Sequence, residues 1–190
     1  MKDFDLMSAQ VFVFEQVGKE ISTKLPKDIN FTNNINEQTI QDLEKLNSEG
    51  KLGWNLPFKL APFMNSISNY EHPVYSVIYY GDKQEGYSCI GFFLGCVNEE
   101  KNAIELNYIE KRNDAHDDLR HCFFASTNEL LIAYASWLNL HEFNINTIAL
   151  IDTLEYIKPH YQKYGYKIDK TYTQESIDVM TLKLLPTQIK

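Results

Sequence analysis

The sequence predicts an α/β (α+β) fold with one mixed sheet, and three observations support this class. Three closely spaced segments after residue 73 are rich in β-branched and aromatic residues, which favour strands. A long segment with helical apolar spacing follows, and then a strand, a helix and a further strand. Apolar residues make up 44% of the 190 residues, which is enough to build a core and excludes an intrinsically disordered chain.

The N-terminal part of the chain, residues 1–72, has the less regular pattern. Residues 5–21 contain a four-residue apolar cluster that fits either a buried strand or one side of a helix, and both interpretations stay open. The asparagine-rich residues 30–34 are typical of a turn. Residues 36–46 are predicted to form a helix, because their apolar side chains lie on one stripe and Gly50 follows its end.

Residues 74–80, 87–97 and 103–110 are predicted to form an antiparallel three-stranded meander. The first segment stops at a Gly-Asp turn signal, and a short polar stretch separates the second from the third. Polar and apolar residues alternate in the third segment. We therefore expect Ile104, Leu106 and Tyr108 on one face of the sheet and Glu105 and Asn107 on the other.

The second half of the chain begins with a polar loop at residues 111–118 and continues with the clearest helical pattern. Ser126 and Glu129 match a capping box, so the helix is predicted to start there. Its apolar stripe consists of Leu130, Ala133, Tyr134, Trp137 and Leu138. Residues 147–151 are predicted to be a buried strand, 152–164 a helix or two turns disturbed by Pro159, and 179–185 a last strand.

The excess of acidic over basic side chains limits the classes of partner that the chain can bind. The chain has 26 acidic and 18 basic side chains, a net charge of −8, and arginine only at Arg112 and Arg120. Nucleic-acid binding needs clustered Lys and Arg, so we expect no nucleic-acid partner. A net acidic protein attracts amines, polyamines or basic peptides instead.

Neither a membrane nor a metal is expected as a partner. No apolar run reaches the roughly 18–20 residues of a membrane helix, and the acidic start of the chain argues against a secretory signal, so a cytoplasmic location is the default. The three cysteines lack the paired spacing of zinc sites. The acidic and histidine-containing stretch at residues 114–121 lacks both the ligand order of a calcium loop and the His-x-x-x-His spacing of zinc enzymes.

The order of these segments, with the motifs on them, resembles the GCN5-related N-acetyltransferase (GNAT) superfamily. Residues 161–166 are similar to the Y-x-x-x-G-[FY] ending of the family's last major helix, and residues 89–95 to its strand with an I/V-G-F start. Trp137 stands where many members carry an aromatic residue. The resemblance covers residues 74–185 and implies a mixed, mostly antiparallel central sheet flanked by helices. We expect a single GNAT-like domain over residues 1–190, with a recognisable core at 73–190 and a divergent part at 1–72.

The pyrophosphate-binding turn of the family, R/Q-x-x-G-x-G/A, is degenerate in this chain. Counted back from the predicted helix, residues 122–127 lack the glycines and the first Arg or Gln, while Arg120 lies two residues upstream. A helix N-terminus still favours an anion, whatever its sequence. The resemblance thus implies that the CoA pyrophosphate is held by Arg120, Ala125, Ser126, Thr127 and Asn128. The predicted capping box competes for the same N–H groups, so loss of the cofactor is the alternative.

The resemblance also assigns roles in acyl transfer. Tyr161 matches the tyrosine that often protonates the leaving thiolate, and Glu105 lies on the strand where some members place a glutamate that deprotonates the amine. Asn107 and Glu110, on the same strand, are candidate substrate-binding residues. Structural alternatives stay open, because Tyr161 also fits a core position at helical spacing and Glu105 a solvent-exposed strand face.

The sequence therefore predicts an N-acyltransferase that transfers an acyl group directly from acetyl-CoA, its co-substrate, to a small-molecule or peptide amine. The alternative on the same fold is a non-catalytic binding or regulatory module that has lost cofactor binding. An unrelated α/β interaction protein is the third interpretation. Exposed strand edges in such folds often pair, so a homodimer is also left open.

Overall fold

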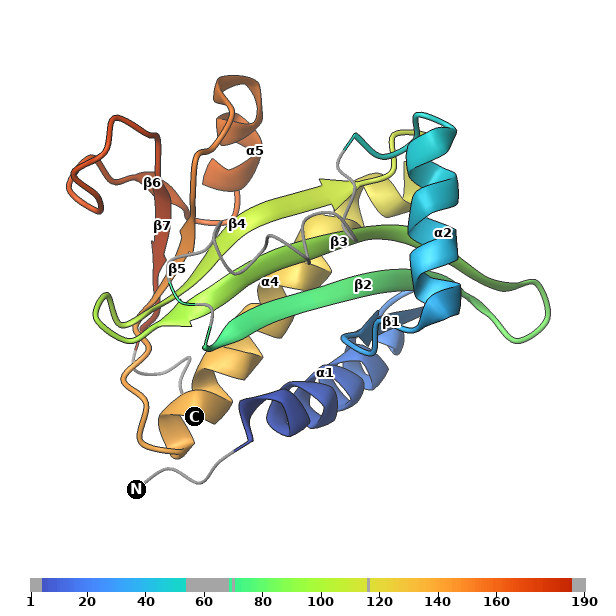
Figure 1. The fold of residues 1–190 in the computed structure, drawn as a ribbon, viewed down its shortest axis with the longest axis horizontal. Helices are drawn as coiled ribbons and strands as arrows, with labels where there is room; N and C mark the ends of the chain where they lie inside the picture. The colour runs from blue at the N-terminus through green and yellow to red at the C-terminus, as the bar shows by residue number, and fades with distance from the viewer. Residues whose placement is uncertain (1–4, 54–68, 70, 116, 186–190) are drawn as a thin grey trace.

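A seven-stranded sheet with helices on both faces is formed by residues 5–53, 69, 71–115 and 117–185, which the computed structural model describes (Figure 1). The strand order is β1-β2-β3-β4-β5-β7-β6. The strands are β1 (Asp28–Thr32), β2 (Pro73–Asp82), β3 (Gly86–Asn98), β4 (Ala103–Lys111), β5 (Thr147–Leu150), β6 (Lys167–Ile168) and β7 (Met180–Lys183). The helices are α1 (Leu6–Ser22), α2 (Glu37–Ser48), α4 (Asp117–Leu140) and α5 (Lys158–Gln162), with a 3₁₀ turn, η2 (Glu155–Ile157), before the last.

The sheet is mixed and mostly antiparallel, as predicted. Strands β1 to β4 pair antiparallel in sequence order, and β7 lies antiparallel between β5 and β6. The meander predicted after residue 73 is therefore confirmed as β2, β3 and β4. Strands β4 and β5 are parallel, and α4 supplies the crossover that a parallel pair requires.

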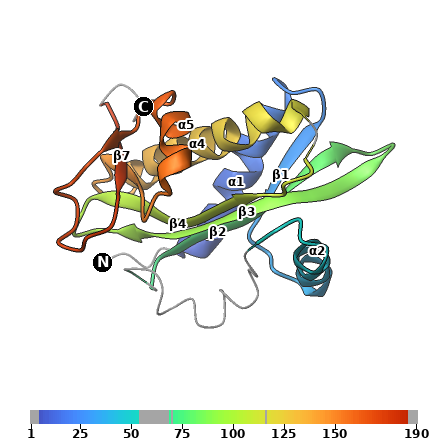
Figure 2. The same ribbon diagram turned by 90° about the horizontal axis from the view of Figure 1, so that it is seen from above.

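Helices α1 and α4 lie on one face of the sheet and α2 lies on the other (Figure 2). On the first face, the ring of Phe14 on α1 is 5.6 Å from Tyr134 of α4 and 6.0 Å from Phe93 of β3. On the second face, Leu43 of α2 packs in a cluster with Phe92 and other strand side chains. Because both faces are covered, a polar side chain buried on either one needs a partner or a function.

The segment at residues 5–21 is a helix, which settles the choice between the two interpretations. Asp5 caps α1 by accepting a hydrogen bond from the Met7 backbone N–H at 3.0 Å. Because the segment is helical, the side chains of the apolar cluster point to different sides of α1. Phe14 is fully buried, while Phe12 is 58% exposed.

The turn predicted at residues 30–34 is wrong. Residues Asp28–Thr32 form strand β1, which pairs antiparallel with β2 along its whole length. Ile29 and Phe31 face the core, and the side chain of Asn30 between them is exposed. Pairing with β2 and burial of one face therefore outweigh the local turn preference of asparagine.

Helix α4 begins at Asp117, well before the predicted start, so the capping-box prediction is wrong. Leu119 and Phe123 are buried in the core on the α1 side, so the apolar stripe starts upstream of the predicted helix. Ser126 consequently lies inside the helix, where it cannot cap it. Glu129 forms an ion pair of 2.5 Å with Lys24, just after the end of α1, instead.

The β3–β4 ladder contains a β-bulge at Asn107. Residues 94 and 95 of β3 pair with Tyr108 and Leu106, which leaves Asn107 without an opposite residue. The extra residue reverses the alternation of faces along the strand. Tyr108 therefore lies on the α2 face together with Glu105, and the prediction that it shares a face with Leu106 is wrong.

Residues 152–164 were predicted to form a helix or two turns. The structure contains a 3₁₀ turn, η2, that leads directly into the short helix α5. Pro159 lies in the first turn of α5, where its missing N–H costs no helical hydrogen bond, so it does not disturb the helix. The strands predicted at residues 147–151 and 179–185 are confirmed as β5 and β7. Strand β6, with two residues, was not predicted.

Candidate functional site

Strands β4 and β5 separate halfway along β4. Their ladder has four residue pairs and ends at Leu106 and Leu150, and the Ile151 N–H then donates to the Leu106 carbonyl at 2.9 Å. The next residue, Asp152, has a φ of 53° in the left-handed region, which turns the chain out of the strand. Because β4 continues to Lys111, its second half runs on beyond its pairing with β5 (Figure 1). The two strands thus diverge.

Asn107 lies immediately beyond the last pair of this ladder. Its side-chain oxygen Oδ1 is buried and has no hydrogen-bond partner among the described residues. Gly95, which pairs with the neighbouring Leu106, allows the strands to approach closely, because a Cβ atom there would lie 1.7 Å from the Glu105 carbonyl oxygen. A buried acceptor without a donor is rare in native proteins and needs an explanation, such as a ligand that completes it.

Glu105 is buried on the α2 face and is only 4% exposed, so the solvent-exposed alternative is wrong. Its Oε1 accepts hydrogen bonds from Asn98 Nδ2 at 3.0 Å and from the Tyr172 hydroxyl at 2.8 Å. The Cys96 thiol lies 3.8 Å from Oε2. The carboxylate is therefore held in a fixed position by neutral donors.

Glu110 and Tyr108 lie farther along β4 on the same face as Glu105. Glu110 Oε1 accepts a hydrogen bond of 2.6 Å from the Gly53 N–H, which ties the segment after α2 to β4. Of the predicted substrate-binding residues, Asn107 and Glu110 both belong to the half of β4 that does not pair with β5.

Tyr161 lies in the core between α4 and α5. It is 8% exposed, and its ring centroid is 4.6 Å from that of Phe124 on α4. Burial, with a smaller contribution from Tyr156, raises the pKa of the Tyr161 phenol to about 12, so it stays protonated at neutral pH. Tyr161 belongs to the same core as Leu106, whereas Glu105 points to the other face of β4. The structure therefore places the two predicted catalytic residues on opposite sides of one strand.

Four of the five residues predicted to hold the pyrophosphate lie in the interior of α4: Ala125, Ser126, Thr127 and Asn128. Their backbone N–H groups donate to carbonyls four residues earlier, so no helix N-terminus forms there and this part of the prediction is wrong. Thr127 Oγ1 donates to the Phe123 carbonyl at 2.9 Å, and Asn128 Oδ1 accepts from the Tyr166 hydroxyl at 2.8 Å. The Arg120 side chain lies outside the described residues.

The chain approaches the central helix through residues 112–115 instead, ahead of the start of α4 at Asp117, which the sequence interpretation missed. Residues 112–117 read Arg-Asn-Asp-Ala-His-Asp, with arginine first and Ala115 and Asp117 where the R/Q-x-x-G-x-G/A pattern has its glycines. The N–H groups of Arg112, Asn113 and Ala115 already donate to carbonyl groups of the protein at 2.9, 3.0 and 3.4 Å. Counting forward from the end of β4, rather than back from the apolar stripe, would have located this turn.

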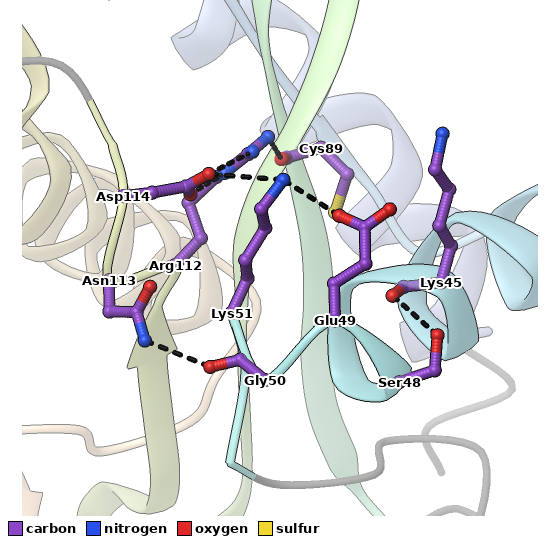
Figure 3. A network of polar contacts seen from close by, with 9 residues as sticks. All are labelled: Lys45, Ser48, Glu49, Gly50, Lys51, Cys89, Arg112, Asn113 and Asp114. Carbon is purple, nitrogen blue, oxygen red and sulfur yellow. Dashed lines mark hydrogen bonds and ion pairs between the residues drawn. The ribbon is translucent and has the colours of Figure 1, made fainter.

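A network of charged side chains joins this turn to the end of α2 (Figure 3). Asp114 accepts hydrogen bonds from Arg112 Nε at 2.5 Å and Nη2 at 2.9 Å, and the Lys51 ammonium lies 3.2 Å from the same carboxylate. Lys51 also pairs with Glu49 at 2.7 Å, and Arg112 Nη1 donates to the Cys89 carbonyl at 3.2 Å. Arg112, and then Lys51, hold the pKa of Asp114 well below its usual range, so this carboxylate is ionised throughout the neutral range.

Two kinds of site are absent from the described part of the chain. No group of three or more His, Cys, Asp or Glu side chains there could hold a metal ion. No helix in the same residues is long and apolar enough to cross a membrane.

Comparison with known proteins places this arrangement in a known class of fold. No family model matches the sequence, and no curated protein matches it. Tetrahymena GCN5 is 13% identical, with a TM-score of 0.51 over 85% of this chain and 98% of that one. An aminoglycoside 6'-N-acetyltransferase complexed with coenzyme A is 14% identical, with a TM-score of 0.51 over 83% and 97%. A GNAT-family acetyltransferase from Staphylococcus aureus is 13% identical, with a TM-score of 0.51 over 83% and 99%.

The chain has the GNAT fold. The matches cover nearly the whole length of these acetyltransferases, and they include the seven-stranded, mostly antiparallel sheet and helices over 83–85% of this chain. At these identities the similarity establishes the fold, and the activity has to be argued from the residues of this chain.

Proposed function

We propose that this chain is an N-acyltransferase that takes acetyl-CoA as co-substrate and an amine as acceptor. The observation that supports this most directly is the unpartnered acceptor of Asn107 at the point where β4 and β5 diverge. The pantetheine arm of CoA carries amide N–H groups, and such a donor is what the buried Oδ1 lacks. The fold similarity to an aminoglycoside N-acetyltransferase supports the same class of reaction.

The residues on the two sides of β4 would divide the proton transfers between them. Acetyl-CoA supplies the acyl group as a thioester. Glu105 takes the proton that the acceptor amine loses as the new C–N bond forms, and Tyr161 donates a proton to the sulfur as the C–S bond breaks. Tyr161 carries its proton at neutral pH and can therefore act as the donor, although its raised pKa makes it a weaker acid than an exposed tyrosine.

The acceptor would lie on the α2 face of β4. Glu105, Tyr108 and Glu110 share this face, and a carboxylate beside an aromatic ring favours a cationic amine. The net charge of −8 adds a long-range attraction of the same sign. Both features support an amine as the acceptor class.

A non-catalytic binding or regulatory module is the second candidate, and the segment at residues 112–117 favours it. The segment has no glycine, and three of its N–H groups donate within the protein. Asp114 also places a negative charge where the family turn receives a diphosphate. A fold that keeps its shape without binding CoA would carry these features.

Release of free CoA thiol from acetyl-CoA, followed with a thiol reagent in the presence of a panel of amines, tests the proposal. We expect amine-dependent release, and we expect Tyr161→Phe to lower kcat at least about tenfold with little change in the Kd for acetyl-CoA. Tyr87→Phe, which removes an exposed phenol hydroxyl bonded to Asp28, serves as the control.

The second candidate would be favoured if neither the wild type nor a glycine-restored variant bound acetyl-CoA at millimolar concentration. That variant, Ala115→Gly with Asp117→Gly, recreates the two glycine positions of the family turn. Binding without amine-dependent release by any acceptor would likewise remove Tyr161 and Glu105 from a catalytic role.

A further inference from the structure

The contacts of Asp114 have the geometry with which proteins bind a phosphate. Two nitrogens of the Arg112 guanidinium contact the two oxygens of the carboxylate, at 2.5 and 2.9 Å, and Lys51 adds a third contact at 3.2 Å. A planar arginine fork with a lysine beside it binds phosphate oxygens in the same bidentate way. In this chain the anion between the two cations is a side chain of the protein itself.

The two cations lie where an anionic ligand could reach them. Arg112 and Lys51 line a depression of about 250 Å³ at the end of α2, together with Lys45 and the carboxylates Asp42 and Glu49. Whole small-molecule sites are larger, roughly 300–1,000 Å³, so this depression suits the charged end of a ligand rather than a complete ligand. It adjoins the turn into α4, where the charged network shown in Figure 3 begins.

We propose that Asp114 is an internal competitor, whose carboxylate occupies the place of a phosphate on Arg112 and Lys51 until a diphosphate-bearing ligand displaces it. With CoA as that ligand, the inference rests on the proposed function. It adds a regulation of the same site: cofactor affinity depends on how readily Asp114 leaves its two partners.

Displacement of Asp114 would disturb little else in the structure. Its side chain is 38% exposed and belongs to the loop between β4 and α4, so the carboxylate can turn to solvent without opening the core. Arg112 keeps its hydrogen bond to the Cys89 carbonyl, and Lys51 keeps its ion pair with Glu49. Both cations would therefore stay in place to receive a ligand.

Calorimetric titration with inorganic pyrophosphate at constant ionic strength tests this inference. We expect Asp114→Asn to bind pyrophosphate about tenfold more tightly than the wild type, because the charge-assisted contacts of Arg112 and Lys51 become available to the ligand. Adding Arg112→Gln to that variant should return the affinity to the wild-type level. Glu20→Gln on α1 removes the same charge at a distance and should change the affinity less than about twofold.

Unchanged affinity in Asp114→Asn would overturn the inference, as would an equal gain in Glu20→Gln, which would indicate a general charge effect. If Asp114→Asn fails to fold, Asp114→Ser replaces it and should show the same gain. Pyrophosphate contains no thioester, so the result does not depend on acyl transfer. A gain in affinity without any transferase activity would refute only the proposed function, and activity without a gain would refute only the role of Asp114.

Discussion

Replacing Asn107 with leucine should stabilise the protein and impair its activity at the same time. The native Oδ1 is buried with no partner among the described residues, and a buried unpaired acceptor costs about 1–3 kcal/mol. A side chain of similar size without polar atoms removes that cost. We therefore expect Asn107→Leu to raise the free energy of unfolding by about 1 kcal/mol, which for a chain of this length raises Tm by about 2–4 °C.

Asn107→Leu should lower catalytic activity even though it raises stability. If Asn107 accepts a hydrogen bond from the acyl donor, its loss costs about 0.5–1.5 kcal/mol, which is roughly a two- to tenfold decrease in kcat/KM for acetyl-CoA. The assays are thermal unfolding and thiol release on the same preparations. Asn144→Leu, at an exposed position after α4, is the control and should leave Tm and kcat/KM almost unchanged.

Two results would refute this reasoning about Asn107. A fall in Tm of several degrees would mean that the oxygen has a structural partner in the free protein. A rise in Tm with unchanged kcat/KM would mean that the unpaired oxygen is not used by the acyl donor. Only the combination of higher stability and lower activity identifies an acceptor that is left unpaired for a ligand.

The other predictions concern the core, a thiol and a phenol. Phe14→Ala should cost about 3–5 kcal/mol in denaturant unfolding because Phe14 is fully buried, whereas Phe12→Ala, 58% exposed, should stay within about 0.5 kcal/mol. Burial raises the pKa of the Cys89 thiol to about 11, so its reaction with a disulfide reagent at pH 8 should be over ~100-fold slower in native than in unfolded protein. The folded pKa of Tyr161, about 12, exceeds the unfolded value of 10.0, so its contribution to stability should be complete below pH 10 and decrease as the pH rises to 12. Tyrosine absorbance and circular dichroism should therefore change together in that range.

The parts of the fold that could be predicted from sequence are those in which a period repeats over many residues. Strands β2 to β4 carry long β-branched and aromatic runs, and the stripe of α4 from Leu130 onward recurs over several turns, so both were located. Strand β1 was missed because it is short and its stability comes from pairing with β2, which lies far away in the sequence.

The candidate site was harder to predict because it depends on register. The capping-box match at Ser126 is a local pattern, and burial of Leu119 and Phe123 upstream outweighed it. The bulge at Asn107 exists only relative to β3, so no single-strand pattern could show that Tyr108 and Glu105 share a face. The sequence pattern placed Glu105 and Asn107 on one strand and Tyr161 in the segment before the last strand, but the faces of β4 on which Glu105 and Tyr161 lie could be assigned only from the structure.

The corrected start of α4 also changes what the net charge of −8 means for an acyltransferase. Arg112 and Lys51 lie beside the segment that leads into α4 at Asp117, whereas the start predicted at Ser126 left only Arg120 nearby. Asp114 and Glu49 neutralise both cations within the protein. Under the proposed function, the overall acidity would favour an amine acceptor, and we expect the carboxylate of Asp114, rather than a lack of cations, to limit the affinity for an anionic acyl donor.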